Sequence, residues 1–147
     1  MKKYFIFTLL GLLIYGLGCQ SPTPPAEDSE ERPASLNPNG DSELAILMRE
    51  MFEEGERIKE EIAEGKKPTI NVDYEAVLTA QATEPEKAAS DTYHAFAVSY
   101  IETMKALKKA SAEEAGKLYV SMVNTCMDCH TELCPGPKRR IRKLVVK

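Results

Sequence analysis

The feature that most restricts the fold of this chain is a series of apolar or small residues spaced alternately four and three positions apart. After Ser42, a residue suited to cap a helix N-terminus, the series comprises Leu44, Met48, Met51, Gly55, Ile58 and Ile62. Because an α-helix turns once every 3.6 residues, this spacing places the whole series on one helix face. Gly65 and Pro68 then favour a helix end.

The same spacing returns twice nearer the C-terminus. One series begins near Asp91 and comprises Tyr93, Ala97, Tyr100, Met104 and Leu107. The last begins at Ser111, whose pairing with Glu114 predicts a capping box, and comprises Ala115, Tyr119, Met122, Cys126 and Cys129. Residues 72–80 form a weaker helical candidate, and Pro85 predicts a break or a fresh start. With no credible strand run, the pattern predicts an all-α fold, an antiparallel four-helix bundle.

The N-terminal residues 1–18 have the composition of an export signal. A short positive start precedes residues 4–18, an uncharged stretch rich in Leu, Ile and Phe. This stretch is shorter than the roughly 20 residues of a membrane-spanning helix, so a permanent transmembrane anchor is the less favoured alternative. Residues 19–41 are rich in Ser, Pro and acidic residues, which is typical of a disordered tether. The folded domain is therefore expected at residues 42–147.

Charge is unevenly distributed along the chain. The net charge is −4 and the pI is about 5.3, an acidic balance that argues against a nucleic-acid partner. Positive charge is concentrated at the end of the chain, in Lys138, Arg139, Arg140, Arg142, Lys143 and Lys147. The C-terminal tail is therefore electrostatically distinct from the rest of the chain, and a solvated basic terminus is its simplest interpretation.

Residues 126–130 read Cys-Met-Asp-Cys-His, the CxxCH pattern of covalent haem c attachment. On a helix, positions i, i+3 and i+4 lie on adjoining parts of one face. Two thiols at this spacing can form thioethers to both vinyl groups of one porphyrin while the following imidazole binds the iron. The export signal strengthens the prediction, because haem is attached to c-type cytochromes outside the cytoplasm. We therefore expect one haem c per chain, with Cys126 and Cys129 as attachment sites and His130 as the proximal iron ligand.

Three other interpretations of these residues are less favoured. A zinc site could use Cys126, Cys129, His130 and Cys134, although Pro135 crowds the fourth ligand. A thioredoxin-like redox pair would need a βαβ setting that the chain lacks. A disulfide between the two motif cysteines would be strained within one helical turn.

The position of the motif limits the type of cytochrome. Only 17 residues follow His130, and none is Met or His, so a sixth iron ligand must lie upstream. A CxxCH motif on the last helix of a four-helix bundle resembles the class II cytochromes c, namely cytochrome c′ and its low-spin, Met-ligated relatives. The resemblance covers about residues 42–134. It implies that the first helix faces the distal side of the haem with either an apolar residue or a Met ligand, and residues 47–51 resemble the Met-bearing subgroup.

The distal ligand has more than one candidate. Met48 lies near the start of the first helix, roughly where the family places its ligand, and is preferred. Met51 is the alternate, one turn later and facing Gly55, a small residue that could make room for the porphyrin. His94 is a third candidate, which would give a lower reduction potential than Met.

The end of the signal, Gly16-Leu17-Gly18-Cys19, resembles the lipobox of bacterial lipoproteins. The resemblance implies that Cys19 is lipidated and becomes the mature N-terminus. The domain would then be anchored on the extracytoplasmic side of a bacterial membrane, facing the periplasm. Gln20 favours the outer membrane.

These features predict a monohaem c-type cytochrome that transfers one electron between redox partner proteins and is not an enzyme. The alternative is a five-coordinate haem protein that binds nitric oxide or carbon monoxide. Arg49, Arg139 and Arg140 are candidate contacts for the haem propionates, and the basic tail also suits an acidic redox partner or anionic lipid. Because relatives often dimerise through their first two helices, a homodimer is a further expected assembly.

Overall fold

The computed structural model describes residues 41–146, and every regular element in that range is helical. The predicted signal (1–18), Cys19 and nearly all of the tether (19–41) lie outside the described residues. The long helices are α2 (Glu43–Ala63), α4 (Asp91–Lys109) and α5 (Ala112–Glu132). The short elements are η1 (Tyr74–Leu78), α3 (Pro85–Ala88), α6 (Lys138–Ile141) and η2 (Arg142–Leu144). None of the helices in this range is long and apolar enough to cross a membrane. The all-α prediction is confirmed for the described chain.

The predicted helix boundaries follow from local capping. The Ser42 hydroxyl accepts a hydrogen bond from the Ala45 N–H at 3.2 Å, and Gly65, with φ of +69°, follows the end of α2 in the left-handed conformation that glycine favours. At α5, the Ser111 hydroxyl accepts from the Glu114 N–H, while the Glu114 carboxylate accepts from the Ser111 N–H. These three caps are those predicted from the sequence.

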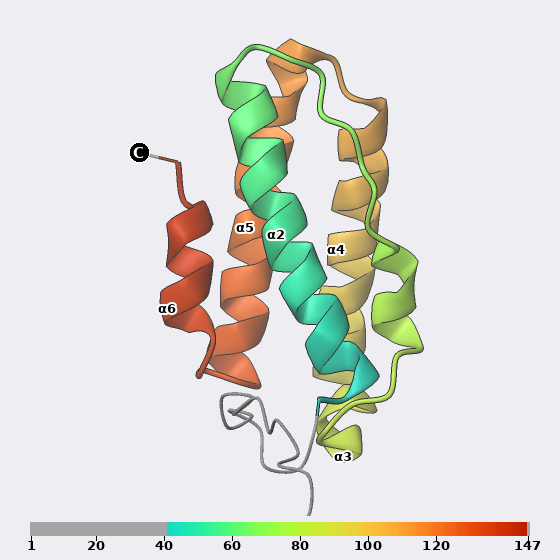
Figure 1. The fold of residues 1–147 in the computed structure, drawn as a ribbon. Coiled ribbons are helices and arrows are strands. Elements are labelled where there is room, and N and C mark those ends of the chain that lie inside the picture. Colours follow the sequence, from blue (N-terminus) through green and yellow to red (C-terminus); the bar gives the residue numbers. More distant parts are fainter. Residues whose placement is uncertain (1–40, 147) are drawn as a thin grey trace, which may run out of the picture. The chain divides into compact units, whose positions relative to one another are not determined.

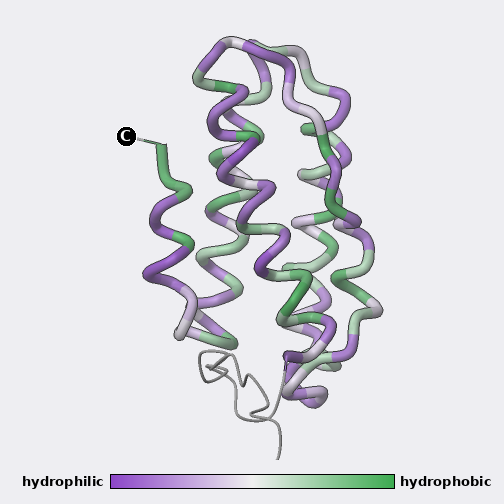
Figure 2. The backbone as a smooth tube through the Cα atoms, in the orientation of Figure 1, coloured by the Kyte–Doolittle hydropathy of each residue, from purple (hydrophilic) through white to green (hydrophobic). Residues whose placement is uncertain are grey.

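The three long helices pack around one core. In Figure 1, α2 and α4 run in the same direction and α5 returns antiparallel to both. The core residues with the least exposure come from all three helices: Ile58, Met104, Leu107, Ala115 and Tyr119. Figure 2 shows that the first half of α2 is more hydrophobic than its second half.

The segment between α2 and α4 lacks the second long helix that a four-helix bundle requires. Within it, residues 72–80 contain only the five-residue η1, which packs against α2 and α4. Pro85 begins a new short helix at its first turn, as predicted. The described residues therefore contain three long helices, with an irregular segment in the place of the expected second one.

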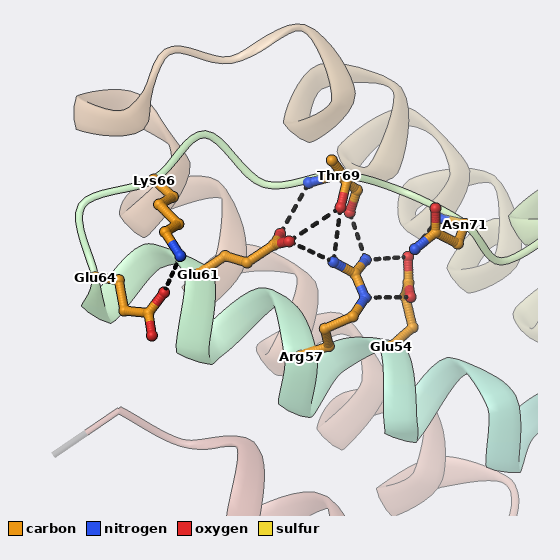
Figure 3. A network of polar contacts seen from close by, with 7 residues as sticks. All are labelled: Glu54, Arg57, Glu61, Glu64, Lys66, Thr69 and Asn71. Atoms are coloured by element: carbon orange, nitrogen blue, oxygen red, sulfur yellow. Dashed lines mark hydrogen bonds and ion pairs between the residues drawn. The ribbon is translucent and has the colours of Figure 1, made fainter.

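Side chains of α2 satisfy the backbone of this segment, as Figure 3 shows. The carboxylate of Glu54, which is buried, accepts from the Asn71 N–H at 2.6 Å and pairs with Arg57 at 2.7 Å. Arg57 in turn donates to the Thr69 carbonyl, and the Glu61 carboxylate accepts from the Thr69 N–H. These bonds replace the hydrogen bonds that a helix would make within itself, so the segment stays extended.

The C-terminal residues 138–146 form a folded part of the domain instead of a solvated terminus. Ile141 and Leu144 are buried, and the Leu144 side chain lies 3.2 Å from the position that a Cβ would take on Gly55. Gly55 therefore makes room for Leu144, which contradicts the expectation that it makes room for a porphyrin. This packing was not predicted because the two apolar residues lie among five cations in the sequence.

Polar contacts hold the same segment in place. Lys59 on α2 donates through its Nζ atom to the carbonyls of Lys143 and Val145, at 2.8 and 3.2 Å. The hydroxyl of Tyr119 on α5, itself fully buried, donates to the Leu144 carbonyl at 2.9 Å. The segment thus lies across α2 and α5 and joins them.

Replacing Leu144 by Ala is expected to lower the free energy of unfolding by about 2–5 kcal/mol, because the change leaves a cavity between Gly55, Met122 and the segment. Val146→Ala is the matched control: this exposed valine should change stability by no more than about 0.5 kcal/mol. Urea denaturation followed by circular dichroism measures both. Equal stability of the two variants would mean that the segment does not pack on the core.

Candidate functional site

The three residues of the motif line one small apolar cavity of about 40 Å³ at the end of the helices where α2 begins. Because they occupy positions i, i+3 and i+4 on α5, Cys126, Cys129 and His130 share its wall. The remaining wall comes from three other elements: Met48 and Met51 on α2, Val77 on η1, and Tyr93, Phe96, Ala97 and Tyr100 on α4, with Thr125 beside the motif. The cavity therefore brings together the predicted attachment residues, the predicted proximal ligand and both candidate methionines.

The two motif thiols are protonated at neutral pH. Burial raises the pKa of the Cys126 thiol to about 12, with a smaller contribution from Cys129. Burial also raises the pKa of Cys129, and the neighbouring Cys134 raises it further. A buried, neutral thiol is a poor nucleophile at neutral pH and a poor ligand for a free cation.

The imidazole of His130 is held in one orientation by the chain that follows it. Its Nδ1 atom lies 2.9 Å from the carbonyl oxygen of Cys134. Because a carbonyl only accepts hydrogen bonds, Nδ1 carries the proton in the neutral ring and Nε2 keeps its lone pair. This is the arrangement that orients a histidine for metal ligation.

This carbonyl is available because the helix stops. α5 ends at Glu132, and Pro135 and Pro137 prevent its continuation, so the Cys134 carbonyl has no helical partner. The helix stop was predicted from the sequence, but its effect on His130 was not. A proline shortly after the motif is the signal that could have revealed it, since it implies an unpaired carbonyl within about one turn of the ring.

The candidate distal ligands differ in position. Met48 and Met51 are both half-buried on the cavity wall, so the structure does not choose between them. His94 is exposed and does not line the cavity, although its neighbour Tyr93 does. Of the three candidates, the two methionines line the cavity and His94 does not.

The candidate propionate contacts lie outside the cavity wall. Arg49 forms an ion pair with Asp41 at 2.8 Å. The guanidinium of Arg140 lies over the ring of Phe52, 4.5 Å from its centre, and Arg139 is exposed. None of the three arginines lines the cavity, and their role as propionate contacts stays a prediction.

Aromatic side chains from α4 supply much of the apolar wall. Tyr93 and Tyr100 belong to the helical series predicted from the sequence, but Phe96 does not, although it lies three residues after Tyr93 and four before Tyr100. The hydroxyl of Tyr93 donates to the Val77 carbonyl at 2.6 Å, and burial raises its pKa to about 12. This bond attaches η1 to α4 beside the cavity.

The donor set suits a haem better than a free metal ion. Within residues 41–146 no group of three His, Cys, Asp or Glu side chains is arranged to hold a metal ion, so the alternative zinc site gains no support. Two thiols, one oriented imidazole and two thioethers around an apolar cavity are instead the groups that haem c would use. The cavity is far smaller than the roughly 300–1,000 Å³ of common cofactor sites, so its side chains must separate to admit a porphyrin.

Comparison of the chain with protein-family models, with curated proteins and with solved structures finds no match. The interpretation of the site therefore rests on the motif and on the geometry around it.

The cofactor-free chain is expected to show a fixed order of thiol reactivity. Burial raises the pKa of Cys126, which lowers the fraction of this thiol that is ionised at a given pH. Iodoacetamide at about pH 8 should therefore modify exposed Cys134 first, Cys129 more slowly and Cys126 last. Peptide mass spectrometry measures each rate. Modification of Cys126 as fast as Cys134 would contradict the buried position, and unfolding in urea should remove the difference.

Proposed function

We propose that this chain is a monohaem c-type cytochrome that transfers single electrons between redox partners. The observation that carries the proposal is the convergence of Cys126, Cys129 and His130 on one apolar cavity with two methionines of α2. The position of the motif on the last long helix agrees with the resemblance to the class II cytochromes c. In this proposal, the irregular segment with η1 would stand where that family has its second helix, and the haem domain would be a variant of the four-helix arrangement.

Each residue has a distinct task in this proposal. Cys126 and Cys129 would hold the porphyrin through thioether bonds, and His130, oriented by the Cys134 carbonyl, would ligate the iron through Nε2. When bound, the haem supplies the iron that changes between the ferric and ferrous states. The thioether of Met48, or of Met51, would favour the ferrous state, while the aromatic wall from α4 would keep water away from the iron.

The proposed location is extracytoplasmic, with the domain anchored by a lipid on Cys19 and facing the periplasm. The export-type N-terminus supports this location, because haem is attached to c-type cytochromes outside the cytoplasm. The same proposal includes an anchor in the outer membrane, redox partner proteins that are not identified, and a homodimer.

Covalent haem attachment is the first prediction to test. The chain produced with cytochrome maturation machinery should give one haem per chain in a pyridine haemochrome assay. The double variant Cys126→Ser with Cys129→Ser should lose covalent haem entirely, because no thioether can form. Cys134→Ser is the matched control and should retain it, since this exposed thiol does not line the cavity and its backbone carbonyl is unchanged. Absence of haem from the unmodified chain would overturn the proposal.

The spin state of the oxidised holo-protein tests the distal ligand. We expect a low-spin, six-coordinate spectrum that becomes high-spin in Met48→Ala, because Ala has no sulfur atom that can bind the iron. Met127→Ala is the control, since Met127 lies in the motif without lining the cavity. A high-spin spectrum in Met51→Ala and not in Met48→Ala would reassign the ligand. Immediate stoichiometric binding of carbon monoxide to the reduced, unmodified protein would instead favour the gas-binding alternative.

A further inference from the structure

The segment 138–146 carries a dense group of positive charges on an acidic domain. Five of the six residues from Lys138 to Lys143 are Lys or Arg. By contrast, residues 41–137 contain ten Lys and Arg against nineteen Asp and Glu. The segment is therefore a local positive surface on a domain that is otherwise negative.

Packing fixes the direction in which these charges face. Ile141 and Leu144 are buried against the core, so the positions between them on the helical path face outward. Arg139, Arg142 and Lys143 are exposed. Because Lys59 and Tyr119 hold the segment by its carbonyls, the three cations are presented on an ordered backbone. Little backbone entropy is then lost when they meet a partner.

The outward cations are not neutralised within the domain. None of Arg139, Arg142 and Lys143 forms an ion pair with a carboxylate of the described residues, whose ion pairs lie elsewhere, at Arg49, Arg57, Lys66, Lys87 and Lys105. The neighbouring Arg140 stacks on Phe52 within the domain. The three exposed cations are thus available to an external anion.

An apolar pair lies directly beside these cations. Val145 and Val146 are 47% and 53% exposed, the highest values among the large hydrophobic residues of the described chain. Cations and exposed valines side by side fit a broad anionic surface that also accepts shallow apolar contact.

We propose that residues 138–146 dock the domain on the surface of an anionic phospholipid membrane. Arg139, Arg142 and Lys143 contact the headgroups, and Val145 and Val146 reach the boundary between headgroups and acyl chains. An acidic protein would meet the same cations, but charge pairing alone gives no reason for two exposed valines beside them. The proposal does not depend on haem, because none of these residues lines the motif cavity.

Hydrogen exchange tests this docking on the full chain reconstituted into vesicles. Vesicles of phosphatidylcholine alone are compared with vesicles that contain about 30% phosphatidylglycerol, so any attachment through the N-terminus is common to both. We expect the amides of residues 141–146 to exchange about threefold more slowly on the anionic vesicles. The slowing should vanish at about 1 M NaCl, where the Debye length is about 3 Å.

Two triple variants test whether the outward cations cause the slower exchange on anionic vesicles. The triple variant Arg139→Gln, Arg142→Gln and Lys143→Gln should lose the slowing. The triple control Lys108→Gln, Lys109→Gln and Lys117→Gln removes the same charge from exposed lysines of α4 and α5 and should keep it. Equal exchange on both vesicle types, or equal loss in both triple variants, would overturn the proposal. Slowing by soluble poly-L-glutamate without slowing by anionic vesicles would reassign the surface to an acidic protein, which also overturns it.

Discussion

The close approach of α2 and α5 at Gly55 is the contact on which the arrangement of the site depends. Leu144 lies against Gly55, whose Cβ position is also 3.7 Å from the terminal carbon of Met122. The two helices are antiparallel, so one turn from this contact toward the start of α2 corresponds to one turn toward the end of α5. That step leads to Met51 on one helix and to Cys126 on the other, and both line the same cavity. The C-terminal segment therefore helps to fix the register of α2 against the motif.

The sequence predicted the elements whose causes are local. The caps at Ser42 and Ser111 and the left-handed Gly65 depend on neighbouring residues alone, and all three are present. Residues 64–90 were harder to predict because their conformation depends on side chains of another element, chiefly Glu54 and Arg57. An extended backbone stabilised by a distant carboxylate leaves no periodic pattern to recognise.

Parts of the candidate site were likewise predicted from the sequence, and other parts were not. Motif spacing placed Cys126, Cys129 and His130 on one helical face, and the apolar spacing of α2 brought Met48 and Met51 to the same cavity. The expected role of Gly55 was wrong, because the residue that fills its space is 89 positions later in the chain. The Cys134 carbonyl was missed for a different reason: a backbone atom has no signature of its own, and its availability depends on where the helix stops.

Burial of the motif also restricts the order of events if the chain carries haem. The cavity of about 40 Å³ is smaller than a porphyrin, and Cys126 is half-buried on its wall. Thioether formation requires each sulfur to reach a vinyl carbon, so the side chains of α2 and α4 would have to stand apart from the end of α5 while haem is attached. The same aromatic and thioether side chains that fill the cofactor-free cavity would then pack against the porphyrin faces. A site that closes only after attachment can be dry and rigid, and a dry, rigid site limits the reorganisation that accompanies a change of charge.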